Sequence, residues 1–130
     1  MATTSRWIAI VDDDPSVLKA LQRSLRVRAF RTTTYSSAND FLASLSEELP
    51  ECLIIDQQMP QMTGLELHQH LTSQGIRIPT IMITAYYDVL LRERSQAAGV
   101  AALLSKPLRN ASLFDAIDAA LGNLPEAFDS

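Results

Sequence analysis

The chain has 130 residues, a formal net charge of −4 and an apolar fraction of 47%, values typical of one folded globular domain. The acidic balance disfavours non-specific binding to nucleic acid and to anionic membranes, and no apolar run approaches the ~18 residues of a membrane-spanning helix. The single cysteine and the absence of a signal-peptide pattern favour a cytoplasmic protein. From the length we expect no room for a second, DNA-binding output domain in this chain.

Short apolar runs alternate with longer amphipathic stretches along the chain. Continuous apolar runs are typical of strands buried on both faces of a parallel sheet. Five strands are predicted on this basis, the second of them weaker and rich in β-branched residues, at residues 7–11, 30–35, 52–55, 79–84 and 100–105.

Each predicted strand is followed by apolar residues at helical spacing. The first helix begins with Asp14 as N-cap and Pro15 at the first helical position, and runs to about Arg28. Four more helices are predicted at residues 37–49, 65–75, 88–99 and 108–121. Five such strand–helix units predict an α/β fold, a doubly wound five-stranded parallel sheet with helices on both faces.

Polar residues follow the ends of four of the predicted strands: Asp12, Asp13 and Asp14, then Asp56, Thr84 and Lys106. The carboxyl ends of parallel strands share one edge of the sheet, where ligands bind. In the flavodoxin-like order 2-1-3-4-5 the first and third strands are neighbours, so Asp12 and Asp13 would lie beside Asp56.

Three neighbouring carboxylates do not all stay ionised unless a cation joins them. Lys106 compensates one charge, and the remainder suits a hard divalent ion on oxygen ligands, such as Mg²⁺. No glycine-rich turn follows the first strand, which separates the chain from nucleotide-binding relatives of this fold. His68 and His70 are two residues apart on a helix and face different directions, so a histidine metal site is not expected.

Four sequence pieces occur in the same order as in a known family: Val-Asp-Asp-Asp-Pro at 11–15, Asp-Gln-Gln-Met-Pro-Gln-Met-Thr-Gly at 56–64, Ile-Thr-Ala at 83–85 and Lys-Pro at 106–107. With them the chain resembles a response-regulator receiver domain of bacterial two-component signalling, similar to the chemotaxis regulators. The resemblance covers residues 6–122 of a single domain spanning 1–130, with 123–130 expected as a loose tail. It implies the strand order 2-1-3-4-5.

The resemblance also implies roles for the polar residues. Asp56 would be the phosphoacceptor, and Asp13, Asp56 and the backbone carbonyl of Gln58 would bind Mg²⁺ directly. Asp12 would act through a metal-bound water. Lys106 would pair with the incoming phosphoryl group and Thr84 would hydrogen-bond it after transfer, while the Lys106-Pro107 peptide would be cis.

The implied partners are a sensor histidine kinase or phosphotransfer protein and a downstream effector protein. The effector would contact the face formed by the fourth helix, fifth strand and fifth helix, and the chain would be a monomer or a phosphorylation-dependent dimer. Receivers commonly carry Tyr or Phe three residues before the lysine, where this chain has Leu103. Tyr86 or Tyr87 is a candidate substitute.

Two alternatives stay open from the sequence. Asp12, Asp14, Thr84 and Lys106 also match the order of the first three motifs of phosphatases of the haloacid dehalogenase type, although no acidic pair follows a later strand. A receiver-like domain that binds partners without being phosphorylated is the other alternative. Arg23, Arg26, Arg28 and Arg31 are interpreted as a solvated helix end rather than a docking patch, and Cys52 as an inert buried thiol.

Overall fold

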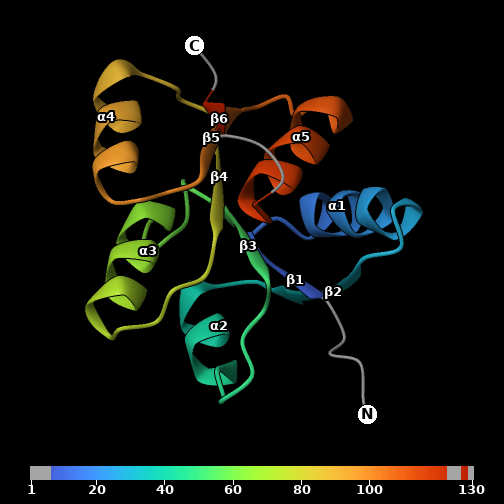
Figure 1. Cartoon of the computed structure of the whole chain (residues 1–130), viewed down its shortest axis with the longest axis horizontal. Helices are drawn as coiled ribbons and strands as arrows, with labels where there is room; N and C mark the ends of the chain where they lie inside the picture. Colours follow the sequence, from blue (N-terminus) through green and yellow to red (C-terminus); the bar gives the residue numbers. More distant parts are fainter. Residues whose placement is uncertain (1–6, 123–126, 129–130) are drawn as a thin grey trace.

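The computed structural model describes residues 7–122 and 127–128. Strands and helices alternate along the chain (Figure 1). The strands are β1 (Trp7–Val11), β2 (Arg31–Tyr35), β3 (Cys52–Asp56), β4 (Thr80–Thr84), β5 (Ala102–Ser105) and β6 (Ala127–Phe128). The helices are α1 (Pro15–Val27), α2 (Ala38–Ser44), α3 (Gly64–Ser73), α4 (Val89–Ala97) and α5 (Asn110–Ala120).

The sheet is parallel throughout, in the order β2-β1-β3-β4-β5-β6. The predicted fold class and the order 2-1-3-4-5 of the first five strands are therefore confirmed. The sixth strand is an addition: residues 127–128, expected within a loose tail, pair with β5. The rest of that predicted tail, residues 123–126 and 129–130, lies outside the described residues.

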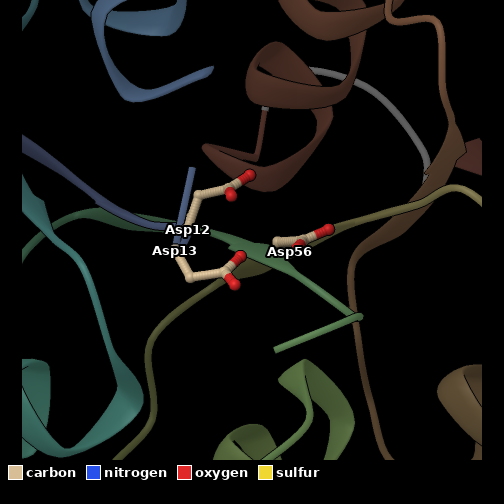
Figure 2. Close-up of side chains that lie close together, drawn as sticks. All are labelled: Asp12, Asp13 and Asp56. Atoms are coloured by element: carbon tan, nitrogen blue, oxygen red, sulfur yellow. The ribbon is translucent and has the colours of Figure 1, made fainter. Parts of the chain in front are cut away.

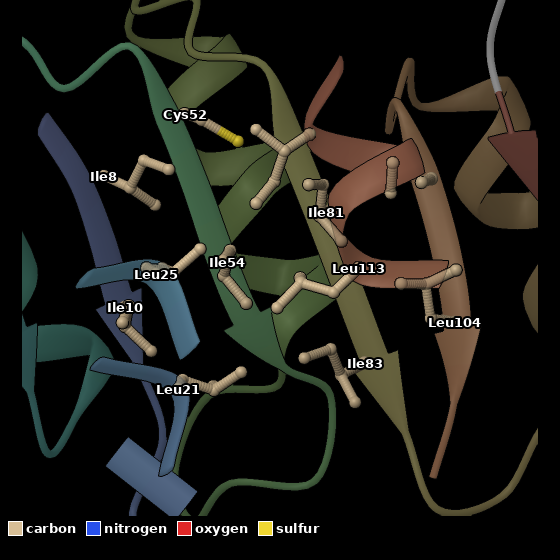
Figure 3. Close-up of a cluster of buried hydrophobic side chains, with 13 residues drawn as sticks. Ile8, Ile10, Leu21, Leu25, Cys52, Ile54, Ile81, Ile83, Leu104 and Leu113 are labelled. Atoms are coloured by element: carbon tan, nitrogen blue, oxygen red, sulfur yellow. The ribbon is translucent and has the colours of Figure 1, made fainter. Parts of the chain in front are cut away.

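The helices cover both faces of the sheet, with α1 and α5 on one side and α2, α3 and α4 on the other (Figure 1). This layering follows from the alternation of side chains along each buried strand. In β1, Ile8 and Ile10 face α1 and α5, whereas Ala9 and Val11 face α2 and α3. Figure 3 shows the first of these cores, in which Ile8 and Ile10 lie with other side chains of the same face.

Side-chain caps fix where four of the five helices begin. The side chain of Asp14 accepts from the Ser16 N–H, which confirms the predicted N-cap of the first helix. The side chain of Ser37 accepts from the Asp40 N–H, and that of Asp88 from the Leu91 N–H. At α3, Thr63 and Glu66 form a reciprocal capping box. Each such cap stabilises its helix by about 1 kcal/mol.

Two residues that the sequence analysis set apart from the site have structural contacts. His68 is buried on α3, with Nδ1 3.1 Å from the Thr80 hydroxyl and Nε2 2.9 Å from the Ala98 carbonyl oxygen. Arg28, the C-cap residue that follows α1, lies 3.8 Å from the Asp118 carboxylate, and its guanidinium lies 4.6 Å from the centre of the Phe114 ring on α5.

Cys52 lies in the core beneath α1 and α5 and is completely buried (Figure 3). Burial raises the pKa of its thiol to about 12, which agrees with the interpretation of an inert thiol. Within the described part of the chain, no helix is long and apolar enough to cross a membrane.

Candidate functional site

Three carboxylates meet at the carboxyl ends of β1 and β3. Asp12 and Asp13 follow β1, Asp56 ends β3, and the two strands pair side by side with Val11 opposite Ile55. Each carboxylate offers one oxygen such that all three oxygens lie within 4.8 Å of one another (Figure 2). Asp12 and Asp56 are 2% and 3% exposed, whereas Asp13 is exposed. The strand order thus produces the acidic cluster that the sequence predicted.

Lys106, directly after β5, reaches into this cluster. Its Nζ lies 3.1 Å from Asp56 Oδ1 and 3.8 Å from Asp12 Oδ2. The Lys106-Pro107 peptide is cis, as expected from the resemblance. Burial alone would lower the pKa of the Lys106 ammonium, but its contact with Asp56 and the charges of both carboxylates outweigh burial and raise that pKa. Lys106 is therefore held as a cation facing the two buried carboxylates.

The cluster retains negative charge that Lys106 does not balance. Burial raises the pKa of the Asp12 carboxyl to about 6, with a smaller contribution from the charge of Asp56 and an opposing hydrogen bond from the Asp14 N–H. Burial also raises the pKa of Asp56, against the effect of Lys106. The Lys106 ammonium, 3.1 Å away, is the partner of Asp56 Oδ1, and the structure shows no further hydrogen bond to this buried oxygen from the described residues.

These features suit a hard divalent cation. The donor set consists of oxygens, Asp56 Oδ1 is buried with Lys106 as its partner, and three acidic groups face one ammonium. Mg²⁺ prefers carboxylate and carbonyl oxygens. A second cation would favour the ionised form of Asp12, against the burial and the smaller repulsion from Asp56 that raise its pKa. The residues present therefore fit a magnesium ion.

The loop after β3 packs tightly against the end of that strand. A Cβ atom at Gly64 would lie 2.8 Å from the backbone oxygen of Asp56, closer than side chains are found. The Gly64 N–H donates to the Gln57 carbonyl, and the Leu65 N–H donates to the Gln57 side chain at 2.8 Å. Glycine at position 64 therefore lets α3 begin directly against the acidic cluster.

Thr84 ends β4 and is completely buried. Its strand pairs with β3, where Ile83 lies opposite Asp56. The Thr84 Oγ1 atom accepts from Gln58 Nε2 at 2.7 Å and from the Tyr86 N–H at 3.1 Å, while Gln58 Oε1 accepts from the Ala85 N–H at 2.9 Å. From the resemblance, Gln58 was expected to bind the metal through its backbone carbonyl and to lie, like Tyr86, where the family tunes the lifetime of the phosphoryl group; a side-chain bridge to Thr84 was not predicted. The Gln58 side chain, which carries both a donor and an acceptor, was the signal that could have indicated this bridge.

Leu103 occupies the position where receivers commonly carry an aromatic residue. It is 0% exposed and belongs to a small cluster beneath α4, with Tyr87 and Leu91 packed against that cluster. Tyr86 is 75% exposed and lies outside the cluster. The proposed substitution of Tyr86 or Tyr87 for the missing aromatic residue stays a prediction.

Fold and site together define a receiver, and a family model of the response regulator receiver domain matches residues 8–118. The chain therefore belongs to the response-regulator receiver family, and the resemblance seen in the sequence is confirmed. Among curated proteins, it is 37% identical over 119 residues to the response regulator protein TmoT of Ectopseudomonas mendocina, covering 92% of this chain and 54% of that protein. It is 33% identical over 124 residues to the transcriptional regulatory protein FixJ of Rhizobium meliloti (strain 1021), covering 95% of this chain and 61% of FixJ.

Solved structures agree with these relatives. The crystal structure of FixJ-N has a TM-score of 0.83 at 32% identity, covering 94% of this chain and 98% of that one. A structure of the response regulator StyR has a TM-score of 0.84 at 36% identity, covering 91% of this chain and 60% of that one. This chain spans little more than half the length of the curated relatives it matches.

Proposed function

We propose that the chain accepts a phosphoryl group on Asp56 from a phosphohistidine of a sensor kinase or phosphotransfer protein, in a cytoplasmic phosphorelay. The observation that carries this proposal is the Asp56 carboxylate itself, buried at the strand ends, 3.1 Å from an ammonium and beside two further carboxylates. A bond forms between an Asp56 carboxylate oxygen and phosphorus, and the phosphorus–nitrogen bond breaks with its electron pair left on the partner's histidine. The product is an acyl phosphate, and its hydrolysis resets the site.

Mg²⁺ is the cation proposed for the acidic cluster. Asp13, Asp56 and the backbone carbonyl of Gln58 would hold it directly, and Asp12 would act through a bound water. When bound, the ion supplies positive charge that offsets both the carboxylates and the oxygens of the transferring group.

The protein's own residues bind and orient the phosphoryl group. Phosphoryl transfer depends mainly on positioning and on neutralising charge spread over three equatorial oxygens. The Lys106 ammonium, which pairs with Asp56 in this structure, would form an ion pair with a phosphoryl oxygen after transfer. Thr84, at the end of the neighbouring strand β4, would donate a hydrogen bond from its hydroxyl group to a second phosphoryl oxygen.

Phosphorylation would change the surface that a partner reads. A phosphoryl group adds about −1.5 to −2 charges, and a shift of Thr84 toward it would pull the loop leading to α4. The face formed by α4, β5 and α5 would then present a different shape to a downstream effector protein. A coupling of about 1–3 kcal/mol between site and face is sufficient for such a switch.

One experiment tests the phosphoacceptor. The chain is incubated with acetyl phosphate and Mg²⁺, and its intact mass is measured for the wild type, Asp56→Asn and Asp12→Asn. We expect one added phosphoryl group in the wild type, lost with EDTA and abolished by Asp56→Asn. Asp115→Asn, on the exposed side of α5, is the matched control.

Each other outcome favours a named alternative. An adduct that survives Asp56→Asn but not Asp12→Asn would indicate the phosphatase chemistry of the haloacid dehalogenase type. Against it, Asp14, the second acid of that motif, is exposed and caps α1 through Ser16. A wild type that gains no mass would indicate a receiver fold used only for binding.

A further inference from the structure

The side chain of Gln58 joins two loops across the mouth of the acidic site. Gln58 lies in the loop after β3, and its amide contacts two consecutive residues after β4: Thr84 through Nε2 at 2.7 Å and Ala85 through Oε1 at 2.9 Å. The backbone donor at Ala85 fixes the orientation of the amide, because an N–H group selects the oxygen and leaves the nitrogen for Thr84. The bridge is therefore a defined two-point contact.

Both bonds end on adjacent residues of one segment, so they form and break together. The Thr84 hydroxyl oxygen uses both acceptor positions on donors of the loop side, Gln58 Nε2 and the Tyr86 N–H. A movement of Thr84 toward a group on Asp56 would stretch the bond to Gln58, and Ala85 would follow through the chain. Ala85 is exposed, so water replaces its lost partner and release leaves no buried N–H group unsatisfied.

Residue 103, where receivers commonly carry an aromatic ring that moves on activation, does not provide a second switching element in this chain. Leu103 is fully buried among Leu65, Met82 and Val100. Moving this aliphatic side chain to an exposed position would cost free energy, so we do not expect it to switch between buried and exposed positions. The Gln58 bridge instead joins the loop after β3 to Thr84 and Ala85, at the start of the segment that leads to α4.

We propose that the Gln58 side chain is a positioning residue that latches the loop after β4 in its resting arrangement, and that phosphorylation of Asp56 acts on α4 by releasing this latch. The proposal rests on the proposed phosphoacceptor function. The two parts of Gln58 would then have separate roles: the backbone carbonyl would bind the metal ion, and the side chain would hold the loop after β4 in its resting arrangement. Removing the side chain therefore makes activation easier, whereas a residue that merely supports the site would make it harder.

The test uses Gln58→Met, which keeps the length of the side chain and the backbone carbonyl but removes both hydrogen bonds, with Gln58→Ala as a second variant. Gln57→Met is the matched control, because the Gln57 side chain accepts from Leu65 on α3 instead of from the loop after β4. The first measurement is amide hydrogen exchange in the metal-free, unphosphorylated chain. We expect exchange at Ala85 to rise about tenfold in both Gln58 variants and to stay unchanged in Gln57→Met.

The second measurement is the affinity for BeF₃⁻, a phosphoryl analogue, in the presence of Mg²⁺. Loss of the two bonds should tighten binding about tenfold in the Gln58 variants, and most of this gain should disappear in the background of Thr84→Val. Unchanged exchange at Ala85, or BeF₃⁻ binding that is unchanged or weaker in Gln58→Met, would overturn the latch. A wild type that binds no BeF₃⁻ would instead overturn the proposed function, and with it the coupling, whatever the exchange rates show.

Discussion

Neutralising Asp12 should stabilise the metal-free protein, although the substitution removes a residue of the site. Asp12→Asn keeps the oxygen that accepts from the Asp14 N–H at 2.9 Å, and it removes a carboxylate that is 2% exposed and close to Asp56. The variant therefore loses the charge while retaining the local hydrogen bond.

The magnitude follows from the pKa of Asp12, which burial raises from 3.8 to about 6. The folded state binds this proton more tightly than the unfolded state, so the folded protein loses stability as pH rises from about 4 to above 6. At about 1.4 kcal/mol for each pKa unit, the loss approaches 3 kcal/mol at neutral pH. The lost attraction to Lys106, 3.8 Å away, reduces the net gain, and we expect Asp12→Asn to add about 1–3 kcal/mol.

Urea unfolding in EDTA at pH 7.5 and at pH 4 measures this effect, with Asp115→Asn as a control for the loss of an exposed aspartate. The gain from Asp12→Asn should be present at pH 7.5 and absent at pH 4, where Asp12 is protonated in the folded wild type. A variant that is less stable than the wild type at pH 7.5, or equally stabilised at both pH values, would refute the argument from burial and repulsion.

Three further predictions concern the metal and the packing. Mg²⁺ should raise the unfolding free energy of the wild type by about 2.7 kcal/mol at one hundred times its Kd, and Asp13→Asn should remove most of this gain in urea unfolding; an equal gain in both would place the ion elsewhere. Gly64→Ala should lower stability by about 1–3 kcal/mol and weaken Mg²⁺ binding by calorimetry, because its Cβ would meet the Asp56 backbone; unchanged binding would contradict this. His68→Leu should cost about 1–3 kcal/mol in thermal unfolding by leaving the Ala98 carbonyl without its donor, and unchanged stability would contradict it.

Much of the fold could be predicted because its signals are local. The apolar strands, the proline after Asp14 and the capping residues Ser37 and Asp88 specify where elements begin. Most observed bounds lie close to those expected, but α2 ends at Ser44 instead of continuing to residue 49, because the backbone of Leu45 is extended. The acidic cluster could also be predicted, since the carboxyl ends of parallel strands share one edge and the residues concerned directly follow the strands. Asp12, Asp13 and Asp56 meet for this reason.

The parts that the sequence did not predict depend on contacts between distant segments. The Gln58 bridge forms because the loop after β3 lies against the loop after β4 and the side chain adopts one conformation. The spacing of apolar residues in the sequence does not indicate such a contact between two loops. The close approach of Gly64 to Asp56 likewise depends on how α3 enters the sheet edge. The pairing of residues 127–128 with β5 adds a strand after a segment without strand-like patterning.

The complete burial of Cys52 has a practical consequence for studying the switch. The chain has one cysteine, and its thiol is both inaccessible and, with a pKa near 12, protonated at working pH. A thiol-reactive fluorophore or spin label should therefore attach only to a cysteine introduced on the surface. Val89, 65% exposed at the first turn of α4, offers such a position next to the loop that the proposal expects to move, so a label there would test the proposed switch with the native core intact.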